Sequence, residues 1–297
     1  MALAFIVGDR LAIVSNKKVD KKAVSFRVEV PKKFVDYEML SMINFAAYLF
    51  EKNGFRVKDV VYGGDLYSKK IDNTYVNVFV RGYAQGIDKR ISDDRIDIYL
   101  VHKFNSIYLE EFRNYDYYLS VNSELADAIG FVNSGKVSLL PIGGVKRELL
   151  KPNYEYDVLY IYEKYDEAIK RVLDEFGKYK IYDGFDFGKL SQKERESELS
   201  KAKIVLYVSN FEEGKGKRYI PFAVYDIISY GRPVMTNNNI VKNDDMIDIF
   251  DSINMLRFKL KRMLQGDDNK RENRAKEIRY NLLKKKYKSD IFAKIKH

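Results

Sequence analysis

Residues 204–239, IVLYVSNFEEGKGKRYIPFAVYDIISYGRPVMTNNN, decide the fold of this chain. Two short apolar runs, 204–209 and 233–236, have the composition of parallel strands that are covered on both faces. Between them, apolar residues at helical spacing predict a helix that carries one inward-facing acid, Asp226, and a Gly-Arg-Pro turn supplies its stop signal. The stretch therefore predicts a βαβ unit, whose strand-to-helix loop commonly binds phosphate through free backbone N–H groups and the helix N-terminus.

The alternation of strands and helices continues on both sides of this unit. Near the start of the chain, AFIVG and LAIVS predict a hairpin that leads into a sheet strand, VSFRVEV. A shift in composition and the Pro152-Asn153 pair indicate a domain boundary near residues 146–156. We therefore expect an α/β fold with two Rossmann-like domains, residues 1–148 and 149–297, the second of which ends in a basic helical segment.

The positive charge of the chain is concentrated at its C-terminal end. The net charge is +10, and residues 255–297 account for all of it, with 15 basic and 5 acidic side chains. Such a segment is either a solvated helical face or a surface that attracts anionic lipid or nucleic acid. A polar stretch at 189–201 precedes the βαβ unit. After that unit, we predict that residues 244–296 are helical. Two apolar stripes favour docking against the core over a membrane face; they comprise Leu256, Leu260, Met263 and Leu264, and Ile278, Leu282, Ile291 and Ile295.

Composition excludes several classes of site. The chain has no cysteine, so it forms no disulfide and no thiolate metal site. It has two histidines, His102 and His297, which argues against a histidine metal centre or a Ser-His-Asp triad. The opening residues lack the pattern of a signal peptide, and no apolar stretch is long enough to span a membrane. We expect a cytoplasmic protein that can associate peripherally with a membrane through its basic segment.

Two features are candidates for a functional site. His102 falls near the C-terminal end of a predicted strand, 95–104, which is the edge where open α/β sheets bind ligands, and it is either a structural residue or a site residue. The run GKGKR matches neither a Walker motif nor a dinucleotide fingerprint. It is either an exposed turn or a phosphate-binding loop whose glycines let backbone N–H groups approach the phosphates; its residues are Gly214, Lys215, Gly216, Lys217 and Arg218.

Three stretches, in order, resemble glycosyltransferases of the GT-B fold: YYLSVNSELADAIG, KVSLLPIGGVKRELLKP and AKIVLYVSNFEEGKGKRYIPFAVYDIISYGRPVMTNNN. They resemble most the retaining group that uses nucleotide sugars, which includes the CgeB-like and group 1 enzymes, and they lie within residues 115–240. The resemblance implies an N-terminal domain on the acceptor side and a C-terminal domain that binds a nucleotide-diphosphate sugar, with UDP or GDP as its nucleotide. It implies no cofactor and no metal.

The resemblance also implies roles for individual residues. Asp226 matches the second acid of the family's glutamate-x7-glutamate motif, which grips the ribose of the donor, with a side chain one methylene shorter. Glu213 lies near the first acid, which faces the donor sugar, but thirteen residues before Asp226 instead of eight. His102 matches a strand-end histidine close to the reacting sugar. Where the family has a basic pair that holds the diphosphate, this chain has only Lys164, so the GKGKR lysines and arginine would supply the remaining charge.

We therefore expect a glycosyltransferase that moves a hexose from a nucleotide sugar to an acceptor hydroxyl, with stabilisation of the diphosphate leaving group as its main chemical task. The acceptor is a glycan, a lipid, a protein or a nucleic acid. Two alternatives remain at this point. The first is a non-catalytic protein of the same architecture that binds nucleic acid or a partner through its basic segment. The second is another nucleotide-sugar enzyme, such as an epimerase, on the same scaffold.

Overall fold

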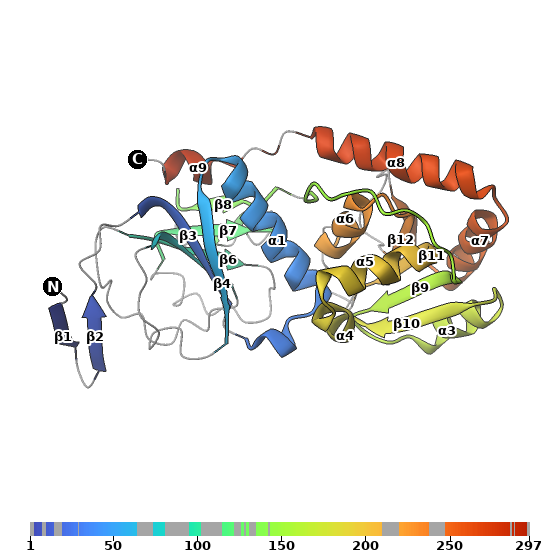
Figure 1. Cartoon of the computed structure of the whole chain (residues 1–297), viewed down its shortest axis with the longest axis horizontal. Coiled ribbons are helices and arrows are strands. Elements are labelled where there is room, and N and C mark those ends of the chain that lie inside the picture. The colour runs from blue at the N-terminus through green and yellow to red at the C-terminus, as the bar shows by residue number, and fades with distance from the viewer. Residues whose placement is uncertain are drawn as a thin grey trace. The chain divides into compact units, whose positions relative to one another are not determined.

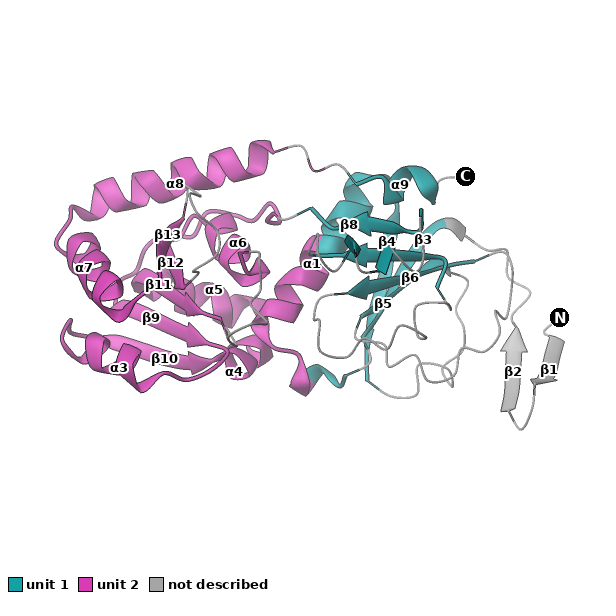
Figure 2. Ribbon diagram, turned by 180° about the vertical axis from the view of Figure 1, so that it is seen from behind, with its two compact units in different colours: residues 1–32, 46–141, 288–297 teal, residues 33–45, 142–287 magenta. Residues whose placement is uncertain are grey.

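The computed structural model describes residues 3–7, 10–14, 20–28, 30–63, 74–80, 95–101, 115–121, 126–127, 129–130, 135–141, 143–209, 220–237, 247–285, 287 and 289–295. The chain folds into two compact units (Figure 2). Unit 1 comprises residues 1–32, 46–141 and 288–297, and unit 2 comprises residues 33–45 and 142–287. The units differ from the expected domains 1–148 and 149–297 at three places, because 33–45, 142–148 and 288–297 are each assigned to the other unit.

Unit 1 is built on a six-stranded parallel sheet in the order β4-β3-β5-β6-β7-β8 (Figure 1). Its strands are β3 (Asp20–Val28), β4 (Arg56–Tyr62), β5 (Thr74–Val80), β6 (Ile96–Val101), β7 (Tyr117–Ser120) and β8 (Val137–Leu139). The predicted hairpin is present as a separate antiparallel pair, β1 (Leu3–Val7) and β2 (Arg10–Val14). A short helix, α9 (Ile291–Lys294), belongs to this unit.

Helix α1 (Tyr37–Lys52) follows a 3-10 turn, η1 (Lys32–Phe34), and contributes to both units. Residues 37–45 of this helix belong to unit 2, and its later residues belong to unit 1. Within unit 1, Phe50 packs edge-on against Phe55 and Phe292, at centroid distances of 5.6 and 5.1 Å. Asn53 and Gly54 end the helix, and Gly54 adopts a φ of 87°, a conformation that favours glycine.

Unit 2 is a five-stranded parallel sheet in the order β10-β9-β11-β12-β13. Its strands are β9 (Tyr156–Tyr162), β10 (Tyr179–Asp183), β11 (Ala202–Val208), β12 (Val234–Asn237) and β13 (Asp248–Phe250). Its helices are α3 (Glu167–Asp174), α4 (Gly184–Lys189), α5 (Gln192–Lys201), α6 (Phe222–Ser229), α7 (Ile253–Leu264) and α8 (Asp268–Lys284). The βαβ unit β11-α6-β12 is therefore confirmed close to its predicted bounds.

Both faces of the unit 2 sheet are buried, as the continuous apolar runs of its strands predict. Along β9, Leu159 and Ile161 join one core cluster, and Val158 and Tyr160 join another. The first cluster also receives residues from α5 and α6, and the second receives residues from α3 and α7. The chain therefore has a sheet with helices on both faces, which is the Rossmann-like arrangement.

The C-terminal segment docks on the cores through its apolar stripes. Leu256 and Leu260 of α7 are buried in one cluster of unit 2, and Leu282 of α8 is buried in the other. Ile291 and Ile295 are buried in unit 1. The predicted core docking is thus confirmed. The prediction of a helical region over 244–296 is confirmed for α7, α8 and α9 but is wrong at β13. Three residues are too few to give a strand pattern, and they form a strand only through pairing with β12.

Candidate functional site

The carboxyl ends of β9 and β11 form the switch point of the unit 2 sheet. From β9 the chain crosses to β10 on one side, and it then returns to β11 on the other side of β9. Loops that leave two neighbouring strands in opposite directions open a crevice between them, and ligands of open α/β sheets bind there. At this edge lie Glu163 and Lys164 after β9, Ser209 after β11 and Asn237 at the end of β12.

Side-chain hydrogen bonds hold the starts of these loops. The Asn237 amide oxygen accepts a hydrogen bond from the Ser209 backbone N–H at 2.9 Å, and its Nδ2 donates to the Ser209 carbonyl at 3.0 Å. The buried Tyr207 hydroxyl donates to Glu163 Oε1 at 3.0 Å. Burial, together with the nearby Glu163 carboxylate, raises the pKa of Tyr207, so its phenol stays a neutral donor. These hydrogen bonds therefore hold Glu163 and Ser209, the first residues after β9 and β11, in place at the edge of the sheet.

Of the predicted site residues, the structure describes Lys164 and Asp226. Lys164 is exposed in the turn between β9 and α3, at the switch point. The segment 210–219 connects Ser209 to α6 and lies outside the described residues. It contains the predicted residues Glu213, Gly214, Lys215, Gly216, Lys217 and Arg218. His102 follows β6 and also lies outside the described residues.

A buried carboxylate caps the N-terminus of α6. Glu38, in the first turn of α1, accepts hydrogen bonds from the backbone N–H groups of Phe222 at 3.0 Å and Ala223 at 2.8 Å. The next N–H group, that of Val224, donates to the Pro221 carbonyl at 3.0 Å. The first three N–H groups of α6 are therefore used within the protein. The expectation that this helix end offers free N–H groups to a phosphate is wrong, because a carboxylate already fills that position.

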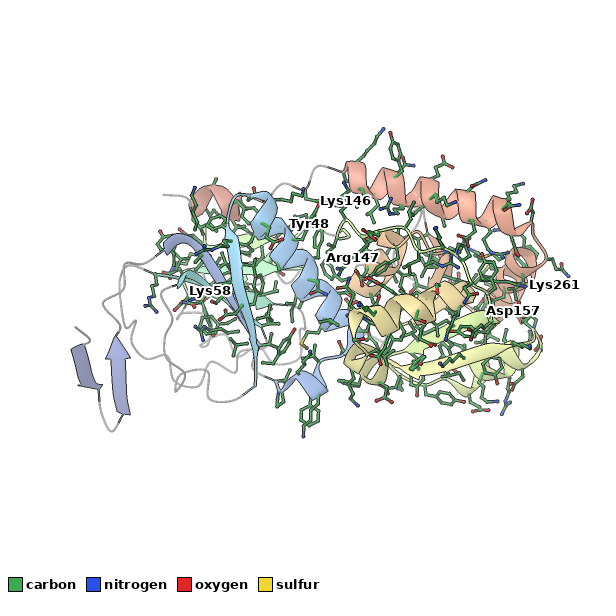
Figure 3. The ribbon with its side chains drawn as sticks, viewed as in Figure 1. Tyr48, Lys58, Lys146, Arg147, Asp157 and Lys261 are labelled. Atoms are coloured by element: carbon green, nitrogen blue, oxygen red, sulfur yellow. The ribbon has the colours of Figure 1, made fainter. Side chains whose placement is uncertain are left out.

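Asp226 lies one turn further along α6 and is 5% exposed. Its Oδ2 accepts a hydrogen bond from the Tyr37 hydroxyl at 3.0 Å, and its Oδ1 forms an ion pair with Arg147 Nε at 3.3 Å. Figure 3 labels Arg147 on the segment that precedes β9. The Arg147 guanidinium also lies over the ring of Tyr230, 5.5 Å from its centroid. The prediction that Asp226 faces inward is confirmed, and both of its oxygens have protein partners.

Arg279 of α8 links this cluster to the C-terminal helix. Its Nε donates to the Ser229 carbonyl at 2.8 Å, and its Nη2 donates to the Arg147 carbonyl at 2.5 Å. Ser229 is the last residue of α6, so the arginine satisfies one of the carbonyls that a helix end leaves free. Residues from α1, α6, α8 and the segment before β9 are thus joined around Asp226.

Electrostatics fix the protonation states in this cluster. Burial raises the pKa of Tyr37, and the Asp226 carboxylate raises it further, so the phenol keeps its proton and donates. Burial alone would lower the pKa of Arg147, but the neighbouring Asp226 carboxylate outweighs it and holds this pKa above its ordinary value. The cluster therefore contains a neutral phenol and a charged guanidinium on either side of one carboxylate.

Sequence reasoning missed Tyr37, Glu38, Arg147 and Arg279. Arg147 lies within KVSLLPIGGVKRELLKP, so the resemblance covered its position but assigned it no role. Tyr37 and Glu38 lie 189 and 184 residues before their partners on α6. No local pattern indicates such a pairing, because periodicity reports which side chains are buried and not which distant groups they meet.

The described residues lack two further features, a membrane-spanning helix and a metal-binding cluster. No described helix is long and apolar enough to cross a membrane. The described part of the chain also contains no group of three or more histidine, aspartate or glutamate side chains arranged to hold a metal ion.

The comparisons with known proteins identify the fold. No protein-family model and no curated protein matches the sequence. Among solved structures, the chain is similar to an alpha-glucosyltransferase in complex with UDP-glucose and DNA containing an abasic site, with 10% identity, a TM-score of 0.57, and coverage of 88% of this chain and 94% of that one. It is also similar to an alpha-glucosyltransferase in complex with UDP and a 13-mer DNA containing a central A:G mismatch, with 11% identity, a TM-score of 0.56 and the same coverage. With its two parallel sheets, the chain therefore has the GT-B fold of two Rossmann-like domains.

Proposed function

We propose that this protein is a glycosyltransferase that moves a sugar from a nucleotide-diphosphate sugar to an acceptor hydroxyl. The observation that carries the proposal is the switch point of unit 2, where Lys164 follows β9 and Ser209 follows β11; segment 210–219, with its basic run, comes next in the sequence after Ser209. The similar glucosyltransferase structures contain UDP or UDP-glucose, which supports a nucleotide sugar as the donor here. The three resembling motifs favour a retaining, metal-independent hexosyl transfer.

In this proposal, Asp226 contributes to binding of the donor nucleotide. A carboxylate offers about four lone-pair positions, and the contacts with Tyr37 and Arg147 use two of them. Ribose hydroxyls are donors that suit the remaining positions. Tyr37 and Arg147 are positioning residues, because they orient the carboxylate and keep its charge balanced inside the protein.

Basic side chains stabilise the diphosphate of the donor. Glu38 occupies the N-terminus of α6, so in this proposal Lys164 and the three basic residues of the GKGKR run balance the negative charge of the phosphates. The two glycines of that run let backbone N–H groups contribute. Glu213 then faces the donor sugar, and His102 contacts the sugar or the acceptor. These groups would stabilise the negative charge that grows on the leaving group.

A thermal-shift screen with UDP, GDP, ADP, CMP and their sugar conjugates tests the donor site. A ligand at a hundred times its dissociation constant stabilises the native state by about 2.7 kcal/mol. We expect one nucleotide diphosphate to raise the melting temperature, and we expect Lys164→Ala and Asp226→Asn to weaken that rise. Lys178→Ala is the matched control, because Lys178 is exposed just before β10, at the opposite edge of the sheet. Stabilisation by no nucleotide, or equal loss in the control, would overturn the proposal.

A second candidate function is binding of nucleic acid without sugar transfer. The observation that favours it is the set of exposed basic residues on α7, on α8 and just after α8, namely Lys261, Arg262, Lys270, Arg274, Lys276, Lys284 and Lys285. Binding of a fluorescent DNA duplex should then weaken steeply with salt, since each neutralised phosphate contributes a slope of about −0.9 to log K against log salt. This candidate requires tight, salt-dependent binding together with no nucleotide-induced stabilisation. Binding that does not change with salt would exclude it.

A further inference from the structure

Segment 143–154, which leads into β9, contains no helix or strand, yet it brings Arg147 to Asp226. Strands are held by ladders of backbone hydrogen bonds, whereas an irregular segment is held by bonds to the elements beside it. One such bond joins the Leu150 N–H to the Tyr230 carbonyl at 3.1 Å, just after α6. Helix α8 packs against α6 and is the second neighbour of the segment (Figure 1). The position of Arg147 therefore depends on what α8 offers.

Arg279 of α8 holds the backbone of this segment and the end of α6 at the same time. Its Nη2 donates to the Arg147 carbonyl at 2.5 Å, and its Nε donates to the Ser229 carbonyl at 2.8 Å. A guanidinium is planar, and its N–H donors point in fixed directions. The two carbonyls are therefore held at a fixed separation by one rigid group.

The side chain of Arg147 turns back to α6. Its Nε lies 3.3 Å from Asp226 Oδ1, and its guanidinium lies 5.5 Å from the centroid of the Tyr230 ring. Asp226 is inside α6, Ser229 is the last residue of this helix, and Tyr230 follows it. The contacts therefore form a closed ring, which runs from Arg279 through Arg147 to α6 and from Ser229 back to Arg279.

Two glycines allow the segment to approach α6 and α8 closely. A Cβ on Gly144 would lie 2.8 Å from a backbone carbonyl of α6 and 3.1 Å from Leu282 of α8. A Cβ on Gly231, whose φ is 75°, would lie 2.4 Å from the Leu149 side chain and 3.6 Å from Arg279 Cδ. The segment therefore packs directly on both helices, beside the Arg279 side chain.

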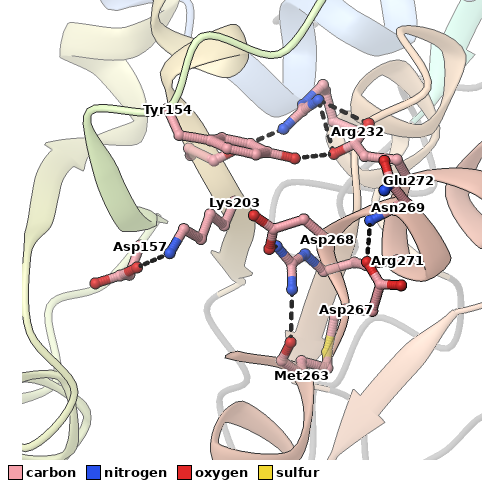
Figure 4. A network of polar contacts seen from close by, with 11 residues as sticks. Tyr154, Asp157, Lys203, Arg232, Met263, Asp267, Asp268, Asn269, Arg271 and Glu272 are labelled. Atoms are coloured by element: carbon pink, nitrogen blue, oxygen red, sulfur yellow. Dashed lines mark hydrogen bonds and ion pairs between the residues drawn. The ribbon is translucent and has the colours of Figure 1, made fainter. Parts of the chain in front are cut away.

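A second anchor joins α8 to the core of unit 2 at Glu272. Figure 4 shows this carboxylate between Arg232 and Tyr154. Arg232 Nη1 pairs with Glu272 at 3.1 Å, and the Tyr154 hydroxyl donates to Glu272 Oε1 at 2.5 Å. These contacts meet the far end of segment 143–154 and do not include Arg147. Glu272 therefore docks α8 independently of the Arg279 contact.

We propose that Arg279 is a positioning residue for the donor site and that it acts through Arg147. This role rests on the proposed function, in which Asp226 contributes to binding of the donor nucleotide. Arg279 holds the Arg147 backbone so that the guanidinium stays at Asp226. The buried carboxylate then keeps its orientation and a compensating charge. Without Arg279, the Arg147 side chain loses its fixed distance from Asp226, and the nucleotide binds more weakly.

Isothermal titration of the whole chain with UDP, GDP and ADP tests this role. We expect the nucleotide that binds the wild type to have a dissociation constant about fivefold higher or more in Arg279→Gln. Glu272→Gln is the matched control for weaker docking of α8, because it should lower the melting temperature and leave the dissociation constant unchanged. Glu277→Gln, at an exposed position on the same helix, should change neither.

Two readouts separate positioning from a general loss of structure. In hydrolysis of the glucose conjugate of that nucleotide, Arg279→Gln should raise KM with kcat nearly unchanged, because the ground state and the transition state lose the same contact. A partly unfolded enzyme would instead lose kcat at an unchanged KM. In Arg147→Gln/Arg279→Gln, the dissociation constant should equal that of Arg147→Gln alone, because the effect passes through the Arg147 guanidinium.

The outcomes distinguish this role from the proposed function. If no nucleotide binds the wild type, the proposed function fails, and the role of Arg279 fails with it. If a nucleotide binds the wild type and Arg279→Gln equally, only the role of Arg279 is overturned. The same holds if Glu272→Gln weakens binding as much as Arg279→Gln does, or if kcat falls at an unchanged KM. Additive effects in the double variant would also overturn it, since Arg279 would then act without Arg147.

Discussion

Glu38→Ala should destabilise unit 2 strongly, because this carboxylate holds the N-terminus of α6. The side chain is 3% exposed and accepts two backbone hydrogen bonds, from Phe222 at 3.0 Å and from Ala223 at 2.8 Å. Leaving a buried donor unsatisfied costs about 1–3 kcal/mol, and loss of a side-chain N-cap typically costs about 1 kcal/mol. Some relaxation and entry of water reduce the sum. We therefore expect the unfolding free energy to fall by about 2–4 kcal/mol.

The Gln variant separates charge from hydrogen bonding at the same position. Glu38→Gln keeps one acceptor oxygen but loses the charge that complements the helix dipole, so we expect a loss of about 1–2 kcal/mol. Glu51→Ala is the matched control, because Glu51 is an exposed acid on the same helix. Its effect should stay within about 0.5 kcal/mol.

Urea unfolding, followed by circular dichroism and tyrosine fluorescence, measures these differences, since the chain has no tryptophan. If the two units unfold in separate transitions, the change belongs to the transition of unit 2. Hydrogen exchange supplies a local readout, because the amides of Phe222 and Ala223 should lose protection in Glu38→Ala. A loss below about 0.5 kcal/mol, or unchanged protection of these amides, would refute the role of Glu38 as the cap of α6.

Three further predictions follow from the unit 2 contacts. Tyr37→Phe removes the hydroxyl that donates to Asp226 at 3.0 Å and should cost about 1.5–3 kcal/mol in the unfolding free energy, measured by urea denaturation; a neutral result would mean that solvent replaces this bond. Burial alone would raise the pKa of Glu198, but hydrogen bonds from Lys180 and Tyr156 hold this pKa below the ordinary value of 4.5. The Glu198 carboxylate therefore stabilises the fold above pH 4.5, and this stabilisation is lost as the pH falls through the lowered pKa. The stability difference between the wild type and Glu198→Gln should therefore shrink in urea titrations below pH 4.5, and a constant difference would contradict the linkage. Gly144→Ala would place a Cβ 2.1 Å from the Ser229 hydroxyl and 2.8 Å from a backbone carbonyl of α6, so it should lower the unfolding free energy by about 1–3 kcal/mol. Gly130→Ala is its control, because a Cβ there meets nothing within 4 Å. Equal effects of the two substitutions would contradict the packing argument.

Much of the local structure of unit 2 was predictable from patterns in the sequence. Short apolar runs predicted β11 and β12 because parallel strands with two covered faces need apolar residues at every position. The polar stretch 189–201 was harder to assign. It contains α5, whose capping box of Ser191 and Glu194 is a recognisable start signal. Its composition obscured the helix, because Leu199 is its only buried apolar side chain.

The sequence by itself determined the α/β fold class, the βαβ unit of residues 204–236 and the docking of the basic C-terminal segment on the cores. These properties depend on the spacing of apolar residues along the chain, because that spacing decides which face of a helix or strand can be buried. Only the tertiary structure decided that Glu38 occupies the N-terminus of α6, that Asp226 pairs with Tyr37 and Arg147, and that the buried Arg232 pairs with Glu272. Each of these contacts joins elements that are far apart in sequence, and polar partners are selected by position in space, which no spacing pattern along the chain encodes.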